Sequence, residues 1–95
     1  MNSLNAHIEK LDCPDETERI YAAEDIGYLN APDGVQPLLE RLGKEPSRAV
    51  RGAIFQALTR IDADAAIEGS VRLLGSDDPE IRNQAVEVLR HKGAA

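Results

Sequence analysis

The chain has 95 residues, which is enough for a single domain over residues 1–95 but too few for a large hydrophobic core. Its formal charge of −6 repels phosphate backbones and anionic lipid headgroups, so we expect neither a nucleic acid nor a membrane as partner. The single cysteine, Cys13, excludes an internal disulfide, and no apolar run approaches the length of a signal-peptide core or a membrane span, so we expect a cytoplasmic protein.

Three apolar stripes, each with a spacing of four and then three residues, run along the chain. They are Leu4, Ile8 and Leu11, then Val35, Leu39 and Leu42, and finally Ile67, Val71 and Leu74. This spacing is that of one face of a helix, and no strand-like alternation competes with it. With the segments that follow them, the stripes predict helices at residues 3–11, 16–29, 34–42, 47–61, 65–74 and 79–91.

The residues that flank these segments agree with the predicted helix ends. Residues that cap helix N-termini well stand at or beside five of the six starts, namely Asp15, Asp33, Ser47, Asp64 and Asp78. Gly43 and Gly75 follow the last apolar residue of two helices, where a left-handed glycine commonly ends a helix. We therefore expect side-chain caps at the starts and left-handed glycines at these two ends.

The second helix of each predicted pair carries the same pattern, an arginine followed by small and aliphatic residues. It occurs at residues 19–26, 51–58 and 82–89, at spacings of 32 and 31 residues. A fixed period of this length is typical of helical repeat proteins. The sequence thus predicts three units, at about 3–31, 33–62 and 64–92, each with an A helix followed by a B helix.

The turns between the A and B helices resemble those of short bacterial HEAT-like repeats of the phycobilisome (PBS) lyase type. The matching segments are Gly43-Lys-Glu-Pro46 with Val50-Arg51, and Gly75-Ser-Asp-Asp-Pro79 with Ile81-Arg82. The first unit departs, with Cys13-Pro14 in its turn and Glu18 in place of an aliphatic residue, as suits a terminal unit that meets water. The resemblance implies an all-α fold, a short right-handed α-solenoid of three HEAT-like helix pairs.

Catalytic and metal-binding groupings are missing from the sequence. Hydroxylases that this family includes carry His-Glu pairs on their B helices, whereas neither His7 nor His91 is followed by glutamate. There is no Gly-rich phosphate loop and no Ser-His-Asp arrangement. We therefore expect no metal, no cofactor and no catalytic role. The resemblance alone carries an alternative, a lyase or chaperone-like subunit that acts on a phycobilin-bearing protein.

The recurring arginines, Arg19, Arg51 and Arg82, admit two interpretations. In the first they form a structural ladder, in which each guanidinium pairs with acidic groups such as Asp12, Glu45 and Asp77. In the second they form an anion-binding row. Their identical place in every unit favours the ladder, because repeats preserve their stacking contacts while binding residues vary.

The candidate partner-binding residues are therefore those that differ between units on the face of the B helices that points away from the A helices. They are Ile20, Glu24, Phe55, Gln56, Thr59, Asn83, Val86, Glu87 and Arg90. An apolar centre with a polar rim is typical of protein interfaces, so we predict a protein-protein interaction or adaptor module that presents its concave B-helix face. Phe55 could instead pack between neighbouring B helices. A homodimer through exposed apolar ends of the solenoid is a further expectation.

Overall fold

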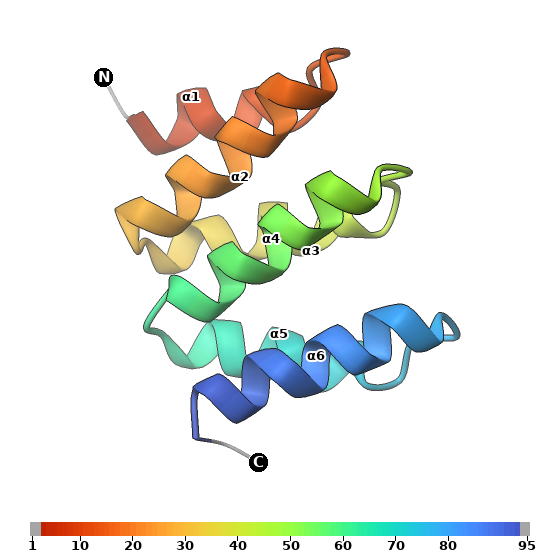
Figure 1. Cartoon of the computed structure of the whole chain (residues 1–95). Coiled ribbons are helices and arrows are strands. Elements are labelled where there is room, and N and C mark those ends of the chain that lie inside the picture. The colour runs from red at the N-terminus through yellow and green to blue at the C-terminus, as the bar shows by residue number, and fades with distance from the viewer. Residues whose placement is uncertain (1–2, 94–95) are drawn as a thin grey trace.

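The computed structural model describes residues 3–93, so residues 1, 2, 94 and 95 of the expected domain lie outside it. Helices joined by short turns make up this range, and it contains no strand. Six α-helices and one short 3₁₀ helix make up the fold (Figure 1). They are α1 (Ser3–Lys10), α2 (Glu16–Leu29), η1 (Pro32–Gly34), α3 (Val35–Leu42), α4 (Arg48–Arg60), α5 (Asp64–Leu73) and α6 (Pro79–His91). The prediction of an all-α chain with six helices is confirmed, and the ends differ by at most one residue.

The helices form two layers, with the A helices α1, α3 and α5 behind the B helices α2, α4 and α6 (Figure 1). Within each pair the A helix packs on the B helix that follows it, and α4 packs on both α2 and α6. This is the arrangement expected when each helix pair buries its apolar face against the next pair.

The B helices begin as predicted. Asp15, Ser47 and Asp78 each accept a hydrogen bond from a backbone N–H in the first turn of the helix that follows. The predicted caps Asp33 and Asp64 are wrong, because neither side chain caps a helix. Asp33 lies inside η1, where the chain bends through a 3₁₀ turn before α3, and Asp64 is already the first residue of α5.

The predicted left-handed glycines are also wrong. Gly43 has φ −65° and Gly75 has no positive φ, because the helices end in tightened turns with backbone bonds such as Lys44 N–H to Arg41 O. The left-handed end belongs instead to Asn30, with φ 53° and ψ 38° after α2. Its side chain accepts a hydrogen bond from the backbone N–H of Asp62 at 2.6 Å, which ties the end of α2 to the end of α4.

Small residues bring α2 and α4 into close contact. A Cβ atom on Gly27 would lie 2.9 Å from the Cα of Ala57, so there is no room for a side chain at this point. Ala23 and Ala53 are buried one helical turn earlier on the same helix faces. The α2–α4 contact is therefore closed, and no pocket opens between these two helices at that point.

Candidate functional site: a groove between α4 and α6

The arginine row (Arg19, Arg51 and Arg82) is bound to the turns that precede the B helices. Arg19 Nη1 donates to the carbonyls of Cys13 at 2.9 Å and Pro14 at 3.0 Å. Arg51 Nη1 donates to the carbonyls of Glu45 and Pro46, and Arg82 Nη1 donates to the carbonyl of Ser76. In every unit the guanidinium thus reaches a carbonyl six residues before it, which explains why the arginine recurs at that place.

Glu45 links this row to the neighbouring unit. Its side chain is fully buried and accepts both Nε and Nη2 of Arg19 at 3.0 Å, Nε of Arg41 at 2.8 Å and the backbone N–H of Ser47 at 3.0 Å. Burial alone would raise the pKa of this carboxyl, but these hydrogen bonds outweigh it and hold the pKa below its usual value. The expected carboxylate Asp12 pairs instead with Arg41 and Lys44.

A groove runs between α4 and α6 on the B-helix layer. It consists of two adjoining pockets of about 610 and 430 Å³ that share Gly52, Phe55 and Gln84. The remaining lining residues are Arg48, Arg51, Gln56, Thr59, Arg60, Glu80, Asn83, Glu87, Val88 and His91. We call this feature the α4–α6 groove.

Larger side chains open this groove where the α2–α4 contact is closed. On α4, Phe55 and Thr59 hold the repeat positions that Ala23 and Gly27 hold on α2. On α6, Gln84 and Val88 hold the repeat positions that Ala53 and Ala57 hold on α4. Gly52 adds further space, since a Cβ atom there would meet nothing within 4 Å. The repeated architecture is thus the same in both contacts, while side-chain volume decides which one is hollow.

The structure divides the predicted partner-binding residues into two groups. Five of them line the α4–α6 groove, namely Phe55, Gln56, Thr59, Asn83 and Glu87. The other four, Ile20, Glu24, Val86 and Arg90, do not line it. Val86 and Arg90 hold the α6 positions equivalent to Phe55 and Thr59 on α4, so the same repeat position faces a different side of the stack.

Phe55 belongs to the core and also lines the groove. Its side chain is only 5% exposed and belongs to the core, and its remaining surface forms the floor of the groove. Sequence reasoning missed Gln84, Val88 and His91, because it took the same repeat positions from every helix. The two helices that form a groove contribute different repeat positions to it. Gln84, Val88 and His91 hold the repeat positions of Ala53, Ala57 and Arg60 in the preceding unit, and that correspondence could have identified them.

The amide side chains in the groove are unpaired. Gln56, Asn83 and Gln84 are exposed, and their side-chain amides make no hydrogen bond with any other group of residues 3–93. Thr59 differs, since its hydroxyl donates to the Phe55 carbonyl at 2.9 Å. Each free amide offers a donor and an acceptor on a neutral group.

The charged side chains of the groove are only partly balanced. Arg48 binds Glu80 through Nε at 3.2 Å and Nη2 at 2.6 Å, and Arg51 Nη2 lies 3.7 Å from the same carboxylate. The hydrogen bond from Arg48 lowers the pKa of Glu80 and raises that of Arg48. Two cations share one anion at this end. At the other end Arg60 lies over the ring of Tyr28, 4.5 Å from its centroid, and has no carboxylate partner within residues 3–93.

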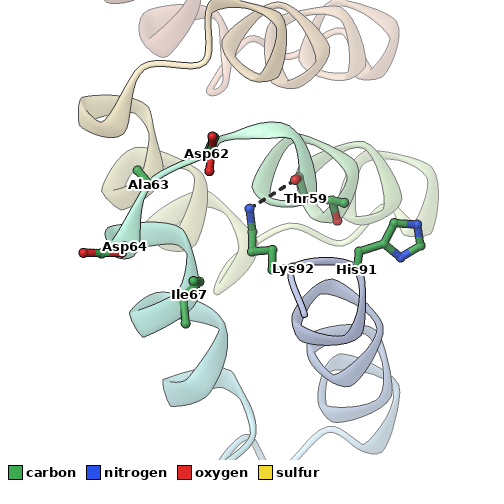
Figure 2. Close-up of a pocket in the computed structure, with 7 residues that line it drawn as sticks. All are labelled: Thr59, Asp62, Ala63, Asp64, Ile67, His91 and Lys92. Atoms are coloured by element: carbon green, nitrogen blue, oxygen red, sulfur yellow. Dashed lines mark hydrogen bonds between the residues drawn. The ribbon is translucent and has the colours of Figure 1, made fainter. Parts of the chain in front are cut away.

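A smaller pocket of about 380 Å³ lies beside the groove, at the ends of α4 and α6 (Figure 2). Lys92 points into this region, and its Nζ donates to the carbonyls of Thr59 at 3.1 Å and Ile61 at 2.6 Å. Burial lowers the pKa of Lys92, while Asp62 opposes that shift. The ammonium group therefore caps the C-terminus of α4 and is occupied by a structural role.

Neither metal-binding clusters nor membrane spans are found in the part of the chain that the structure describes. Within residues 3–93, no three His, Cys, Asp or Glu side chains lie together in an arrangement that could hold a metal ion. Over the same range no helix has both the length and the apolar character needed to cross a bilayer.

Comparison with known proteins supplies the family. No curated protein matches the chain significantly. A model of HEAT repeats matches residues 4–90, which covers all six helices except Ser3 at the start of α1 and His91 at the end of α6. The chain therefore belongs to the HEAT-repeat family.

Proposed function

We propose that this protein is a non-catalytic binding module that presents the α4–α6 groove to a protein partner. The observation that carries the proposal is the groove itself, an open space lined by three unpaired amides on a chain whose other interhelical contact in the same layer is closed. HEAT repeats are commonly scaffolds for protein-protein interaction, which supports the same function. The resemblance to phycobilisome lyase repeats rests on turn and arginine patterns and carries no second function here.

Gly52 provides a direct test of this surface. Because a side chain at this position would extend into open space, Gly52→Trp should fill the groove without disturbing the helices. Gly75→Trp is the matched control, since Gly75 is exposed in the turn before α6, lies outside the groove, and would accept a Cβ atom at an ordinary 3.5 Å contact.

The experiment compares affinity capture by the two variants and by the unmodified protein from extracts of the source cells, with quantitative mass spectrometry. We expect a set of proteins that is captured by the unmodified chain and by Gly75→Trp and is lost with Gly52→Trp. Equal capture by all three, with circular dichroism showing intact helices, would rule out the groove as the binding surface.

Self-association is a separate proposal, carried by exposed apolar side chains on α5, at its C-terminal cap and on α6. Val71, Leu74 and Val86 are 51%, 38% and 37% exposed. Val71 holds the repeat position of Leu39 in the preceding unit. The side chain of Leu39 packs closely on the next A helix, since a Cβ atom on Gly69 of α5 would lie only 2.6 Å from it. A second copy of the chain could cover these residues. Light scattering should then show a concentration-dependent dimer that Val71→Lys abolishes, and a monomer at every concentration would exclude it.

A further inference from the structure

We infer that the α4–α6 groove binds an extended segment of the partner, with acidic residues toward both ends and an apolar residue between them. This inference rests on the proposed function, which it makes more specific. It is drawn from three properties of the groove: its neutral hydrogen-bonding groups, its depth at the centre and its uncompensated charge at the two ends.

The first property is the set of free amides. An extended peptide has a backbone N–H and C=O at every residue that are not satisfied within the peptide, and these must find partners when water is displaced. Gln56, Asn83 and Gln84 each carry a donor and an acceptor with no partner in residues 3–93. They therefore match the main chain of an extended ligand rather than a particular side chain.

The second property is the shape of the centre. Phe55 and Val88 are buried beneath the groove and form its apolar floor, while Gly52 leaves an opening above Phe55. This space is flanked by amides rather than by apolar side chains. It therefore accepts one apolar side chain of the ligand and offers no continuous apolar surface beyond it.

The third property is the charge at the ends. Arg48 and Arg51 share the carboxylate of Glu80, so the residues that line this end carry two positive charges and one negative charge. Asp78 acts on Glu80 from outside the lining. Arg60 lines the other end, where its guanidinium lies over the Tyr28 ring of α2 and has no carboxylate partner within residues 3–93. Glu87 lines the same pocket and is paired with Arg90 at 3.0 Å. Both ends thus favour an anionic group, on a chain whose overall charge is −6.

The distance between the ends sets the spacing of the acidic residues. Arg48 and Arg60 lie twelve positions apart on α4, which corresponds to about 18 Å along the helix axis. An extended chain advances about 3.3 Å per residue, so the acidic residues should stand about five or six positions apart.

An amphipathic helix is a poorer occupant of this groove. A helix satisfies its own backbone bonds and docks through an apolar stripe. Here that stripe would lie against Gln56 and Gln84, whose amides would lose water without gaining partners. The same lining that suits an extended chain therefore opposes a helix.

The test uses a phage-displayed library of random peptides selected on the unmodified protein, after removal of phage that bind Gly52→Trp. Enriched peptides are synthesised with a fluorescent label, and their dissociation constants are measured by anisotropy. The variants are Gln56→Ala with Gln84→Ala, Arg60→Glu, and Gln36→Ala. Gln36 is the matched control, because it is an exposed glutamine on α3 outside the groove.

We expect enriched peptides to share two acidic residues flanking an apolar one at the stated spacing. The double glutamine variant should weaken binding by about tenfold or more, the equivalent of losing two modest hydrogen bonds. Arg60→Glu should reverse the preference at one end, so that a peptide with lysine in place of that acidic residue binds better than the original. Gln36→Ala should bind as the unmodified protein does.

Enrichment of peptides with a helical apolar pattern, or of peptides whose affinity is indifferent to Arg60→Glu, would overturn the inference. In either case their loss on Gly52→Trp would still support the proposed function. Failure to enrich any peptide that Gly52→Trp rejects would overturn the extended-segment inference, and the capture experiment would then decide the proposed function by itself.

Discussion

At the residue scale, the buried carboxylate of Glu45 links neighbouring units through a pair of hydrogen bonds from Arg19. It holds Arg19 of α2 and Arg41 of α3 while its own backbone carbonyl accepts Arg51 of α4. Four segments of the chain thus meet at one residue. Removing the Glu45 carboxylate would leave the largely buried Arg19 without a counter-charge, while Arg41 would keep only Asp12.

We therefore expect Glu45→Ala to lower the free energy of unfolding by about 3 kcal/mol, which is a large part of the stability of a small domain. Urea denaturation followed by circular dichroism measures the loss. Glu80→Ala is the matched control, since Glu80 accepts only from exposed or turn-bound arginines, and it should change stability little. Equal losses for the two variants would contradict the central role of Glu45.

The lowered pKa of Glu45 also predicts a dependence on pH. Its ordinary pKa is 4.5, and the folded value lies below that. A carboxyl whose pKa is lowered by folding contributes stability that is fully present above its unfolded pKa and is lost as the pH falls through the folded value. Stability should therefore fall below about pH 4.5, and Glu45→Gln should flatten that part of the pH profile. An unchanged acid limb in Glu45→Gln would show that other carboxyls produce it.

Lys92 is the second residue whose substitution should have a defined effect. Its two hydrogen bonds to the end of α4 are made by a charged donor, so Lys92→Met should cost about 1.5 kcal/mol. Lys44→Met provides the control, because Lys44 is exposed and only approaches Asp12 at 3.7 Å. Urea denaturation of both variants measures the difference, and an equal effect would mean that Lys92 does not act as a cap.

At the element scale, two glycines on neighbouring B helices lie in opposite surroundings. Gly27 faces the backbone of α4, whereas Gly52 faces the open groove. Both lie inside helices, where alanine is intrinsically more favourable than glycine by about 1 kcal/mol.

Gly52→Ala should therefore raise the free energy of unfolding by about 0.5 to 1 kcal/mol, because the new methyl group meets no atom. Gly27→Ala should lower it, since forcing α2 and α4 apart costs about 1 to 3 kcal/mol and outweighs the helix propensity. Opposite signs in denaturant titrations are the expected result. A gain in stability for Gly27→Ala would mean that the two helices separate easily.

The elements themselves could be predicted from the sequence, because each depends on local signals. Apolar spacing indicated the three A helices, and the repeated arginine segments indicated the three B helices. Asp15, Ser47 and Asp78 marked the starts of the B helices. The predictions for Asp33 and Gly43 failed because a 3₁₀ turn and a tightened helix end satisfy the same backbone groups by another route.

The groove could be predicted only in part. The B-helix face was identified, and Phe55, Gln56 and Thr59 lie in it, but Gln84 and His91 were missed. The side-chain volumes on both helices decide whether the contact between them is closed or open. Gly27 and Ala57 are small at the closed α2–α4 contact, whereas Phe55 and Val88 are larger at the open α4–α6 contact. That pairing is a property of the packed structure, and it appears in the sequence only when the correct positions of neighbouring units are compared.

At the scale of the whole molecule, apolar burial is unevenly distributed along the stack. The main core cluster draws many residues from α1 to α4, but only Ala66 from α5 and Val88 from α6. The hydroxyl of Ser70 on α5 is buried without a hydrogen-bond partner in the described chain. In a repeat protein each unit is stabilised mainly by its neighbours, so the last helix pair should be the least stable part.

We therefore expect α5 and α6 to open before the rest of the molecule unfolds. Native-state hydrogen exchange should show weaker protection of backbone amides in residues 64–91 than in α2 and α4. The difference should be larger in Lys92→Met, because that variant loses the hydrogen bonds that link the end of α6 to α4. A peptide bound in the α4–α6 groove would contact both helices, so it should raise protection in α6 more than in α2. Uniform protection across all six helices would instead mean that the α4–α6 contact stabilises α6 as well as the closed α2–α4 contact stabilises α2. The groove would then be a rigid surface rather than one that tightens around its ligand.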